Sequence, residues 1–452
     1  MGPSPGAGAV PEAGQAHQRN PTMNPPPAPA SPRLARLAFA AMLAVYGFSF
    51  FHRTAVPGTI FNELQQELNL SASAIVALGS VFLWVYGSMQ LVAGIAVDRW
   101  GGTRMLLWGG FFAAAGAILF PLADTPGRLY LSRAIAAFGD SFIYLAILKE
   151  VHLLFSPRRF PALIGVAQFA GLAGGMLAML PFERATHFFG WRHALLAMGS
   201  LMAIGVVANF LVLPKLKHFV PHTTAFTLLP VWEILGNRRN WPIFVSGFIN
   251  FPVYFVLQVG VGKKFLQDFV GLSSRQAATF TLIMMTASAS LCLASGFLLH
   301  LTGGRRKPYL VGAASLVLGA AGLLLAGVLC QAGAWLFLTG YILLALSNIA
   351  GPISTTMMKE LNDSRHVAQA LAVVNALAYF GVAVLLMVSG AVLDLFQAGA
   401  EKTAMGLVIY PAHAYATLFA IFTGLAVITL TATGFLRETH GTHSSSLPTP
   451  SE

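Results

Sequence analysis

Long apolar segments alternate with short polar ones along almost the whole chain. No charged residue occurs between Ala72 and Val97, or between Met105 and Ala123. A helix that spans a bilayer needs roughly 20 mostly apolar residues at a rise of about 1.5 Å per residue. Both segments meet that length. The same pattern predicts twelve spanning helices, over residues 35–60, 72–97, 105–124, 129–155, 162–182, 193–213, 242–265, 276–300, 309–330, 334–358, 366–394 and 411–436.

A polar, glycine-rich stretch joins the second and third of these segments and recurs in the second half of the chain. The first copy has glycine at 94, 101 and 102 and arginine at 104; the second has glycine at 296, 303 and 304 and arginine at 306. The offset between the copies is constant. An internal repeat in a hydrophobic chain is typical of membrane proteins that are built from two related halves.

The apolar pattern divides the chain into five regions. We expect a disordered cytoplasmic tail over 1–34, a six-helix half over 35–213, a cytoplasmic linker over 214–241, a second six-helix half over 242–437 and a disordered tail over 438–452. The first residues are rich in Pro, Gly and Ala and cannot bury a core. No short apolar run with a cleavage site precedes the first span, so we expect no cleaved signal peptide. Residues 220–235 of the linker form either a short interfacial helix or a plain tether.

Composition supports a membrane protein and explains the charge. Of 452 residues, 56% are hydrophobic and 10% are charged, against roughly 25% charged in soluble domains. The net charge of +11 comes mostly from Lys and Arg in the loops on the side of the two termini, which predicts that both termini are cytoplasmic. We therefore expect a monomeric, multi-pass protein of the plasma or bacterial inner membrane, with the lipid bilayer and no nucleic acid as its partner.

Other chemistries find little support in the sequence. There is no G-x-x-x-x-G-K-[ST] phosphate loop, which argues against ATP-driven transport. Cys292 and Cys330 lie in apolar segments, and the histidines have no ligand spacing, so we expect no metal and no cofactor. No nucleophile, base and orienting acid form a recognisable motif, and we expect no catalytic residues and no enzyme activity.

The first glycine-rich stretch resembles the signature of the major facilitator superfamily. The matching residues are Gly94, Asp98, Arg99, Gly101 and Arg104. The resemblance runs over nearly the whole chain and implies an all-α fold of twelve transmembrane helices in two six-helix halves, with this loop as a gating latch. Asp98 can accept from a helix N-terminus or pair with an Arg. The alternative is a generic cytoplasmic anchor. His300 takes the place of this acid in the second copy.

Two further matches refine the resemblance. Arg133 and Gly139 are similar to the superfamily's motif in the fourth helix. The stretch from Ser49 to Thr54 resembles the organophosphate and organic-anion branches, and bacterial carriers similar to lysosomal dipeptide uniporters. In the phosphate antiporters an Arg at the place of Arg53 binds the anion. Their partner Arg is missing here, where our alignment puts Gln258.

Charged residues inside the apolar segments are candidates for function, because a charge there costs about 2.5 to 3.5 kcal/mol. Tyr46, Ser49 and Arg53 share one helical face, and Arg53 is the leading contact for a carboxylate or phosphate. The alternative is an Arg that snorkels outward. Lys149 is a second anion contact, or else an interfacial residue paired with Glu150.

Acidic residues in the same half suggest a second hypothesis. Arg133 and Asp140 share a stripe, which makes them a structural or proton-linked pair. Asp140 and Glu150 are the only deep acids, so the hypothesis of proton coupling rests on these two residues and Arg133. Their protonation does not follow from sequence.

The second half offers uncharged polar residues instead. Those that we select as substrate contacts have helical spacing and are Asn250, Tyr254, Gln258, Asn348 and Tyr379. Each has an alternative role in hydrogen bonds between helices. The sequence as a whole predicts a carrier of a small organic anion or zwitterion that works by alternating access. Its rivals are a proton-driven drug exporter and a membrane sensor or scaffold that does not transport.

Overall fold

The computed structural model describes residues 2, 31–156, 159–216, 229–301, 305–362, 367–403 and 407–439. Most of the two expected tails lies outside these residues, as do the middle of the linker, Gly303 and Gly304 of the second glycine-rich stretch, and the side chain of His300.

The first half of the chain forms one group of helices. They are α1 (Pro32–Ala55), α2 (Phe61–Leu68), α3 (Ala72–Trp100), α4 (Gly102–Leu119), α5 (Pro126–Leu154), α6 (Phe160–Leu177), α7 (Leu180–Phe189) and α8 (Trp191–Val212), with short 3-10 turns at Gly58–Ile60 and Leu213–Leu216. The interval between the first two expected spans, 61–71, contains helix α2, which begins directly after the first of these turns.

The second half forms a second group. It contains α9 (Leu229–Gly236), α10 (Trp241–Val259), α11 (Gly262–Asp268), α12 (Ser274–Leu301), α13 (Lys307–Leu329), α14 (Ala334–Ser347), α15 (Ala350–Leu361), α16 (Val367–Leu395) and α17 (Ala412–Gly434), with 3-10 turns at Arg238–Asn240 and Gln397–Gly399. Strands β1 (Glu401–Lys402) and β2 (Val408–Ile409) pair antiparallel. Helix α9 takes up part of the linker interval for which the sequence left helix and tether open.

The expected set of membrane spans is confirmed. Within the described ranges, eleven spans are long and apolar enough to cross a bilayer, and the pair α6–α7, bent by 42°, raises the number to as many as twelve. Helices α14 and α15 together form one of the eleven. The span expected over 162–182 is therefore broken near Ala178, and its second part continues to Phe189.

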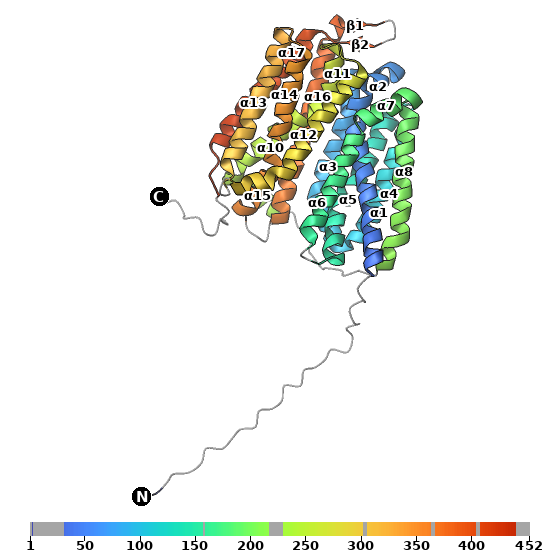
Figure 1. The fold of residues 1–452 in the computed structure, drawn as a ribbon, viewed down its shortest axis with the longest axis vertical. Coiled ribbons are helices and arrows are strands. Elements are labelled where there is room, and N and C mark those ends of the chain that lie inside the picture. The colour runs from blue at the N-terminus through green and yellow to red at the C-terminus, as the bar shows by residue number, and fades with distance from the viewer. Residues whose placement is uncertain are drawn as a thin grey trace.

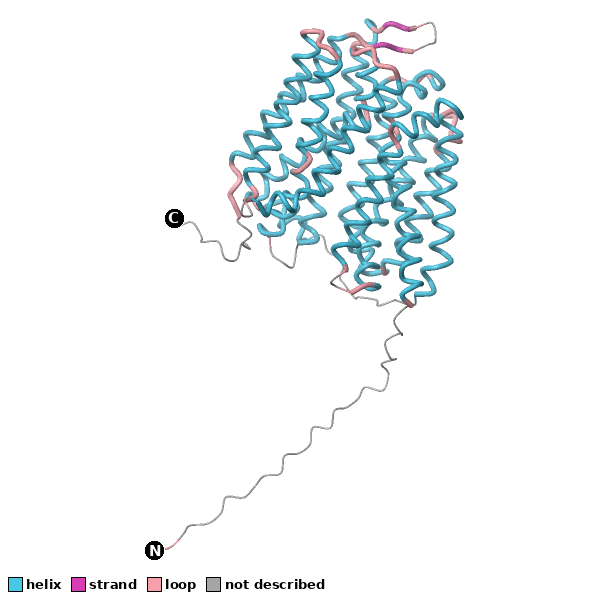
Figure 2. Tube along the Cα trace, viewed as in Figure 1, coloured by secondary structure: helices cyan, strands magenta, loops and turns pink. Residues whose placement is uncertain are grey.

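The two halves lie side by side along α3 and α16 (Figure 1). We call the side where α1 begins and α17 ends the terminal side, and the side with β1 and β2 the hairpin side. Figure 2 shows that the loops gather at these two ends of the helices.

Small residues let the helices of the first half approach closely. A Cβ on Gly139 of α5 would lie 2.3 Å from both the Ala113 nitrogen and the Gly109 oxygen of α4. The two helices therefore touch through their backbones, as small residues allow in membrane proteins. This contact positions the middle of α5, where the candidate site begins.

Candidate functional site

The centre of the molecule holds a buried ion pair between two helices of the first half. Arg53 of α1 is 4% exposed, and its Nη2 lies 3.8 Å from Oδ2 of Asp140 on α5. Its Nη1 donates a long hydrogen bond of 3.5 Å to the hydroxyl of Tyr379 on α16. The guanidinium thus points inward to the interface of the two halves, which excludes the snorkelling alternative.

Aromatic rings surround this guanidinium. Its carbon lies 4.1 Å from the ring centre of Tyr86, 5.0 Å from that of Phe50 and 5.7 Å from that of Phe82. Rings stabilise a cation through their faces but accept no strong hydrogen bond. Nε and Nη2 of Arg53 make no hydrogen bond with a described residue, although Nη2 faces the Asp140 carboxylate at 3.8 Å. These two N–H groups are the candidate donors to an anion.

Tyr46 lies on the same face of α1, as its spacing predicts. Its ring stacks on that of Tyr144, with 5.4 Å between the centres, and the Tyr144 hydroxyl accepts from Gln168 at 2.8 Å. Tyr46 is buried. It therefore forms a wall of the central region toward α5 and α6.

A cavity of about 240 Å³ lies in the second half, next to this centre. Asn250, Asn348 and Tyr379, three of the residues selected from sequence, line it. Asn250 donates to Ser246 at 3.0 Å, and Asn348 donates to Ser288 at 2.6 Å. Tyr379 both lines the cavity and contacts Arg53, so it joins the cation of one half to the cavity of the other.

Two other selected residues do not line this cavity. The Gln258 amide donates to the Thr281 carbonyl at 3.0 Å and contacts the Met179 sulfur at 3.4 Å. Tyr254 is buried at 4% exposure among apolar residues. Gln258 connects α10 to α12 and to the break between α6 and α7. For these two residues the structure favours the alternative of bonds and packing between helices.

Lys149 has a different partner from either one expected. Its Nζ lies 2.6 Å from Oδ1 of Asp98, and the two side chains are 21% and 52% exposed. This pair sits on the terminal side, at the ends of α5 and α3. In this structure Lys149 is therefore paired with Asp98 and is not brought together with Arg53.

Glu150 also belongs to the terminal side. Its Oε1 accepts from the Thr103 hydroxyl at 2.9 Å, next to the start of α4. It is buried, but it lies at the loop between α3 and α4 and not beside Arg53. The Glu150 carboxylate therefore acts as a hydrogen-bond acceptor at the N-terminus of α4.

Arg133 is bound to backbone oxygens and not to Asp140. Its nitrogens donate to the carbonyls of Leu78 at 3.2 Å, His52 at 2.9 Å and Val56 at 3.3 Å. The ion pair of Asp140 is with Arg53. In place of the expected pair with Asp140, Arg133 therefore makes hydrogen bonds that connect α5 to the end of α1 and to α3. Sequence spacing missed it, since the acceptors are main-chain atoms.

The loop expected to gate lies on the terminal side. Asp98, Arg99 and Arg104 are exposed. Gly101 ends α3 with a φ of 88°, and a Cβ on Gly94 would meet nothing within 4 Å. Among the described residues, hydrogen bonds between the halves join Arg53 to Tyr379 and Ser80 to the Ala383 carbonyl, and others lie on the hairpin side.

Side chains of Lys263, Asn62 and Gln65 each donate such a bond between the hairpin ends of the two halves. Lys263 donates to the Thr59 carbonyl at 2.7 Å, Asn62 donates to Gln267 at 3.2 Å, and Gln65 donates to the Tyr410 hydroxyl at 3.0 Å. On the terminal side, the ion pairs Lys149–Asp98 and Arg306–Glu360 each stay within one half.

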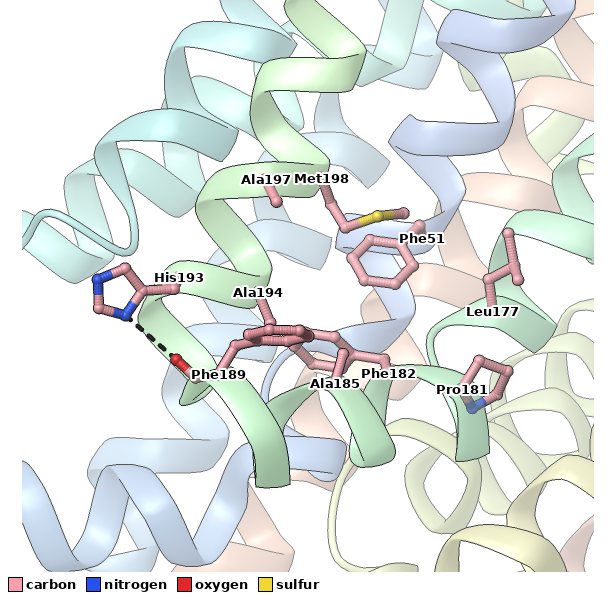
Figure 3. A pocket seen from close by; sticks show the side chains of 10 residues that line it. All are labelled: Phe51, Leu177, Pro181, Phe182, Ala185, Phe189, His193, Ala194, Ala197 and Met198. Carbon is pink, nitrogen blue, oxygen red and sulfur yellow. Dashed lines mark hydrogen bonds between the residues drawn. The ribbon is translucent and has the colours of Figure 1, made fainter.

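A second cavity, of about 480 Å³, differs in character. It lies between α1, α7 and α8 (Figure 3), where Phe51 and Phe182 form part of an apolar wall and His193 contacts the Phe189 carbonyl at 3.2 Å. None of the residues selected from sequence lines it. Its apolar lining does not fit a charged solute.

Comparison with known proteins identifies the family. The model of the Major Facilitator Superfamily matches residues 37–347. Monocarboxylate transporter 11 of Homo sapiens is 27% identical over 262 residues, which cover 57% of this chain and 55% of that protein. The chain matches about half the length of this relative.

Solved structures share the fold. A POT family transporter in complex with 5-aminolevulinic acid has a TM-score of 0.72 at 12% identity, covering 90% of this chain and 97% of that one. A bacterial homolog of the human lysosomal transporter Spinster, inward-facing and unoccupied, has a TM-score of 0.66 at 17% identity, covering 90% and 95%. These identities show the fold alone. With the family match over residues 37–347, the chain belongs to the Major Facilitator Superfamily.

Proposed function

We propose that this chain carries a small organic monoanion, a monocarboxylate, across the membrane by alternating access. The observation that carries the proposal is the buried Arg53, with two guanidinium nitrogens that make no hydrogen bond with a described residue and a third beside the cavity-lining Tyr379. The name of the related Monocarboxylate transporter 11 supports the choice of a carboxylate over a phosphate.

The chemistry of the site fits a solute with one charged end. Two parallel N–H groups of an arginine match the two oxygens of a carboxylate. The cavity beside it offers amides from Asn250 and Asn348 and no ionised lining residue. A carboxylate at Arg53 and a short neutral remainder toward these amides would fill the two parts of the site.

Charge balance suggests how a proton takes part. Arg53 and Asp140 form one cation and one anion with side chains 3% exposed. An anion that binds Arg53 adds a second negative charge beside Asp140. Two like charges on one cation are costly in a site of low dielectric, and a proton on Asp140 removes that cost. Asp140 is accordingly the coupling residue in this proposal, and Glu150, at the terminal side, is not.

The contacts between the halves support a conformation closed on the hairpin side. Together with the basic loops of the terminal side, this corresponds to an inward-facing state with both termini in the cytoplasm. We extend the proposal to a monomer in the plasma membrane, in which the loop from Gly94 to Arg104 latches the terminal side in the opposite state.

A binding experiment tests the anion site. We would record the thermal unfolding of the purified protein with straight-chain monocarboxylates, with the matching neutral amides and with lipophilic amines, because a ligand of the folded state stabilises it. Carboxylates should raise the melting temperature and amides should not. The Arg53→Gln variant should lose the effect, and Arg128→Gln, which changes an exposed arginine of α5, should keep it.

Flux separates the proposal from its rivals. In proteoliposomes the carboxylate that stabilises the protein should enter faster when a pH gradient drives protons in the same direction. Stabilisation by amines that survives Arg53→Gln would favour a drug exporter instead. Binding without any flux would favour a sensor.

A further inference from the structure

Asp394, at the hairpin end of α16, reaches into the other half of the molecule. Its Oδ1 accepts from the backbone nitrogen of Ala72 at 2.9 Å, and its Oδ2 accepts from that of Ser73 at 3.1 Å. These are the first two N–H groups of α3, which have no acceptor within their own helix. Ser71, the residue before the helix, accepts from Ala74 at 3.2 Å. Two residues from different halves thus cap one helix.

The packing of α16 on α3 brings this carboxylate into place. Gly390 lies one turn before Asp394 on the same face of α16. A Cβ at Gly390 would lie 2.4 Å from Cγ2 of Val76 and 2.7 Å from Cα of Ser73. The helices can approach this closely because the residue is glycine. Asp394 then meets the N-terminus of α3 directly.

The carboxylate at the other end of α3 is bound differently. Asp98, in the last turn of α3 on the terminal side, pairs with Lys149 of its own half. In the present conformation Asp394 therefore joins the two halves on the hairpin side, while Asp98 holds two helices of one half together.

We propose that Asp394 is the latch of the hairpin side. Its carboxylate holds α3 to α16 when that side is closed, and it must leave the N-terminus of α3 when the halves separate there. A negative charge at a helix N-terminus is favoured by the helix dipole and by charge-assisted hydrogen bonds. This inference rests on the proposed alternating access and adds the residue that sets the balance between its two states.

A distance measurement tests the latch without any solute. Spin labels at Thr125 and Ala398, both exposed on the hairpin side and one in each half, would be placed in the full chain with Cys292→Ser and Cys330→Ser. Pulsed electron resonance then gives the populations of short and long label distances. Asp394→Asn should raise the ratio of long to short distances roughly fivefold to tenfold, as for the loss of one helix cap.

Two matched variants complete the test. Glu401→Gln removes a carboxylate from exposed β1 on the same side and should leave the distances unchanged. Gly390→Ala keeps the carboxylate but forces α16 away from α3, so it should shift the populations in the same direction as Asp394→Asn. An Asp394→Asn protein that is folded, as shown by its melting curve, and that keeps the unmodified distance distribution overturns the latch.

The outcomes also distinguish the latch from the transport proposal. Shifted distances in a protein that moves no solute would support the latch and overturn transport. Solute flux with distances that Asp394→Asn does not change would support transport and overturn the latch.

Discussion

Arg53 and Asp140 face each other across α1 and α5, with 3.8 Å between Nη2 and Oδ2 and with both side chains 3% exposed. Removing a charge from water costs free energy, and the attraction between Arg53 and Asp140 offsets this cost only while both residues are charged and present. The pair therefore has two separable roles, one in the stability of the first half and one in binding.

The first prediction separates these roles. Arg53→Gln should destabilise the protein by about 3 kcal/mol, because it leaves Asp140 buried without a counter-charge. Adding Asp140→Asn to that variant should recover most of the lost stability but no carboxylate binding. Melting curves with and without ligand measure both effects. A double variant that is no more stable than Arg53→Gln would contradict the ion pair.

The second prediction concerns Arg133. Arg133→Gln should lower the melting temperature, because buried carbonyls of α1 and α3 lose their donor, at about 1 to 3 kcal/mol for each group left unsatisfied. The dependence of flux on a pH gradient should remain in the protein that still folds. Arg128→Gln, on the same helix but exposed, is the control. If flux through the folded Arg133→Gln protein no longer depended on the pH gradient, Arg133 would have a role in proton coupling after all.

The third prediction concerns the hydroxyl between the halves. Tyr379→Phe removes the group that contacts Arg53 but keeps the ring. Carboxylate affinity should change by less than about tenfold, in line with about 0.5 to 1.5 kcal/mol for one hydrogen bond. Tyr379→Leu, which also removes the ring near the guanidinium, should have the larger effect. Equal losses in both variants would assign the contribution of Tyr379 to its hydroxyl alone and contradict a role for the ring.

The fourth prediction tests backbone contact between α4 and α5. Gly139→Ala should destabilise the protein by about 1 to 3 kcal/mol, because its Cβ would overlap the backbone of α4. Gly94→Ala, in open space within the loop expected to gate, should leave the melting temperature unchanged. It should slow flux if Gly94 packs closely in the opposite state. A stable Gly139→Ala protein would show that the helices can separate at little cost.

The fifth prediction is a pH dependence on the hairpin side. Burial acts to raise the pKa of Glu67, but hydrogen bonds from Arg192 and Trp191 outweigh it and lower this pKa below its ordinary value. The folded state thus binds a proton less readily than the unfolded state. Glu67 therefore adds stability above the unfolded pKa, and this stability is lost as the pH falls through the folded pKa.

Melting curves at about pH 7 and about pH 4 measure this contribution. The unmodified protein should lose more stability between the two than Glu67→Gln does. Equal losses in the two proteins would assign the pH dependence to other groups.

The sequence was sufficient for the spans and the two halves, because apolar length and loop charge are local properties. It also selected Arg53 and the cavity-lining Asn250, Asn348 and Tyr379, since polar residues in apolar segments are few. It did not locate the break near Ala178, where the residues remain apolar on both sides.

The interaction partners of these polar side chains were harder to predict than their positions along the helices. Lys149 pairs with Asp98 and Arg133 binds backbone carbonyls, and neither contact follows from helical spacing, because each depends on which helix ends meet. The role of Asp394 was missed for the same reason. It lies near the end of its own helix, and its acceptor function depends on the start of a helix more than 300 residues earlier.

The paired charges at the centre also determine how voltage acts on the proposed cycle. Fixed charges such as those of Arg53, Arg133 and Asp140 are present in both the empty and the loaded protein, and a monoanion that enters with one proton adds no net charge to them. The movement of one elementary charge across the bilayer is worth about 2.3 kcal/mol per 100 mV. A cycle that moves one monoanion together with one proton transfers no such charge, so in the proposed cycle the membrane potential does no net work, and the concentration and pH gradients alone set how far the solute accumulates.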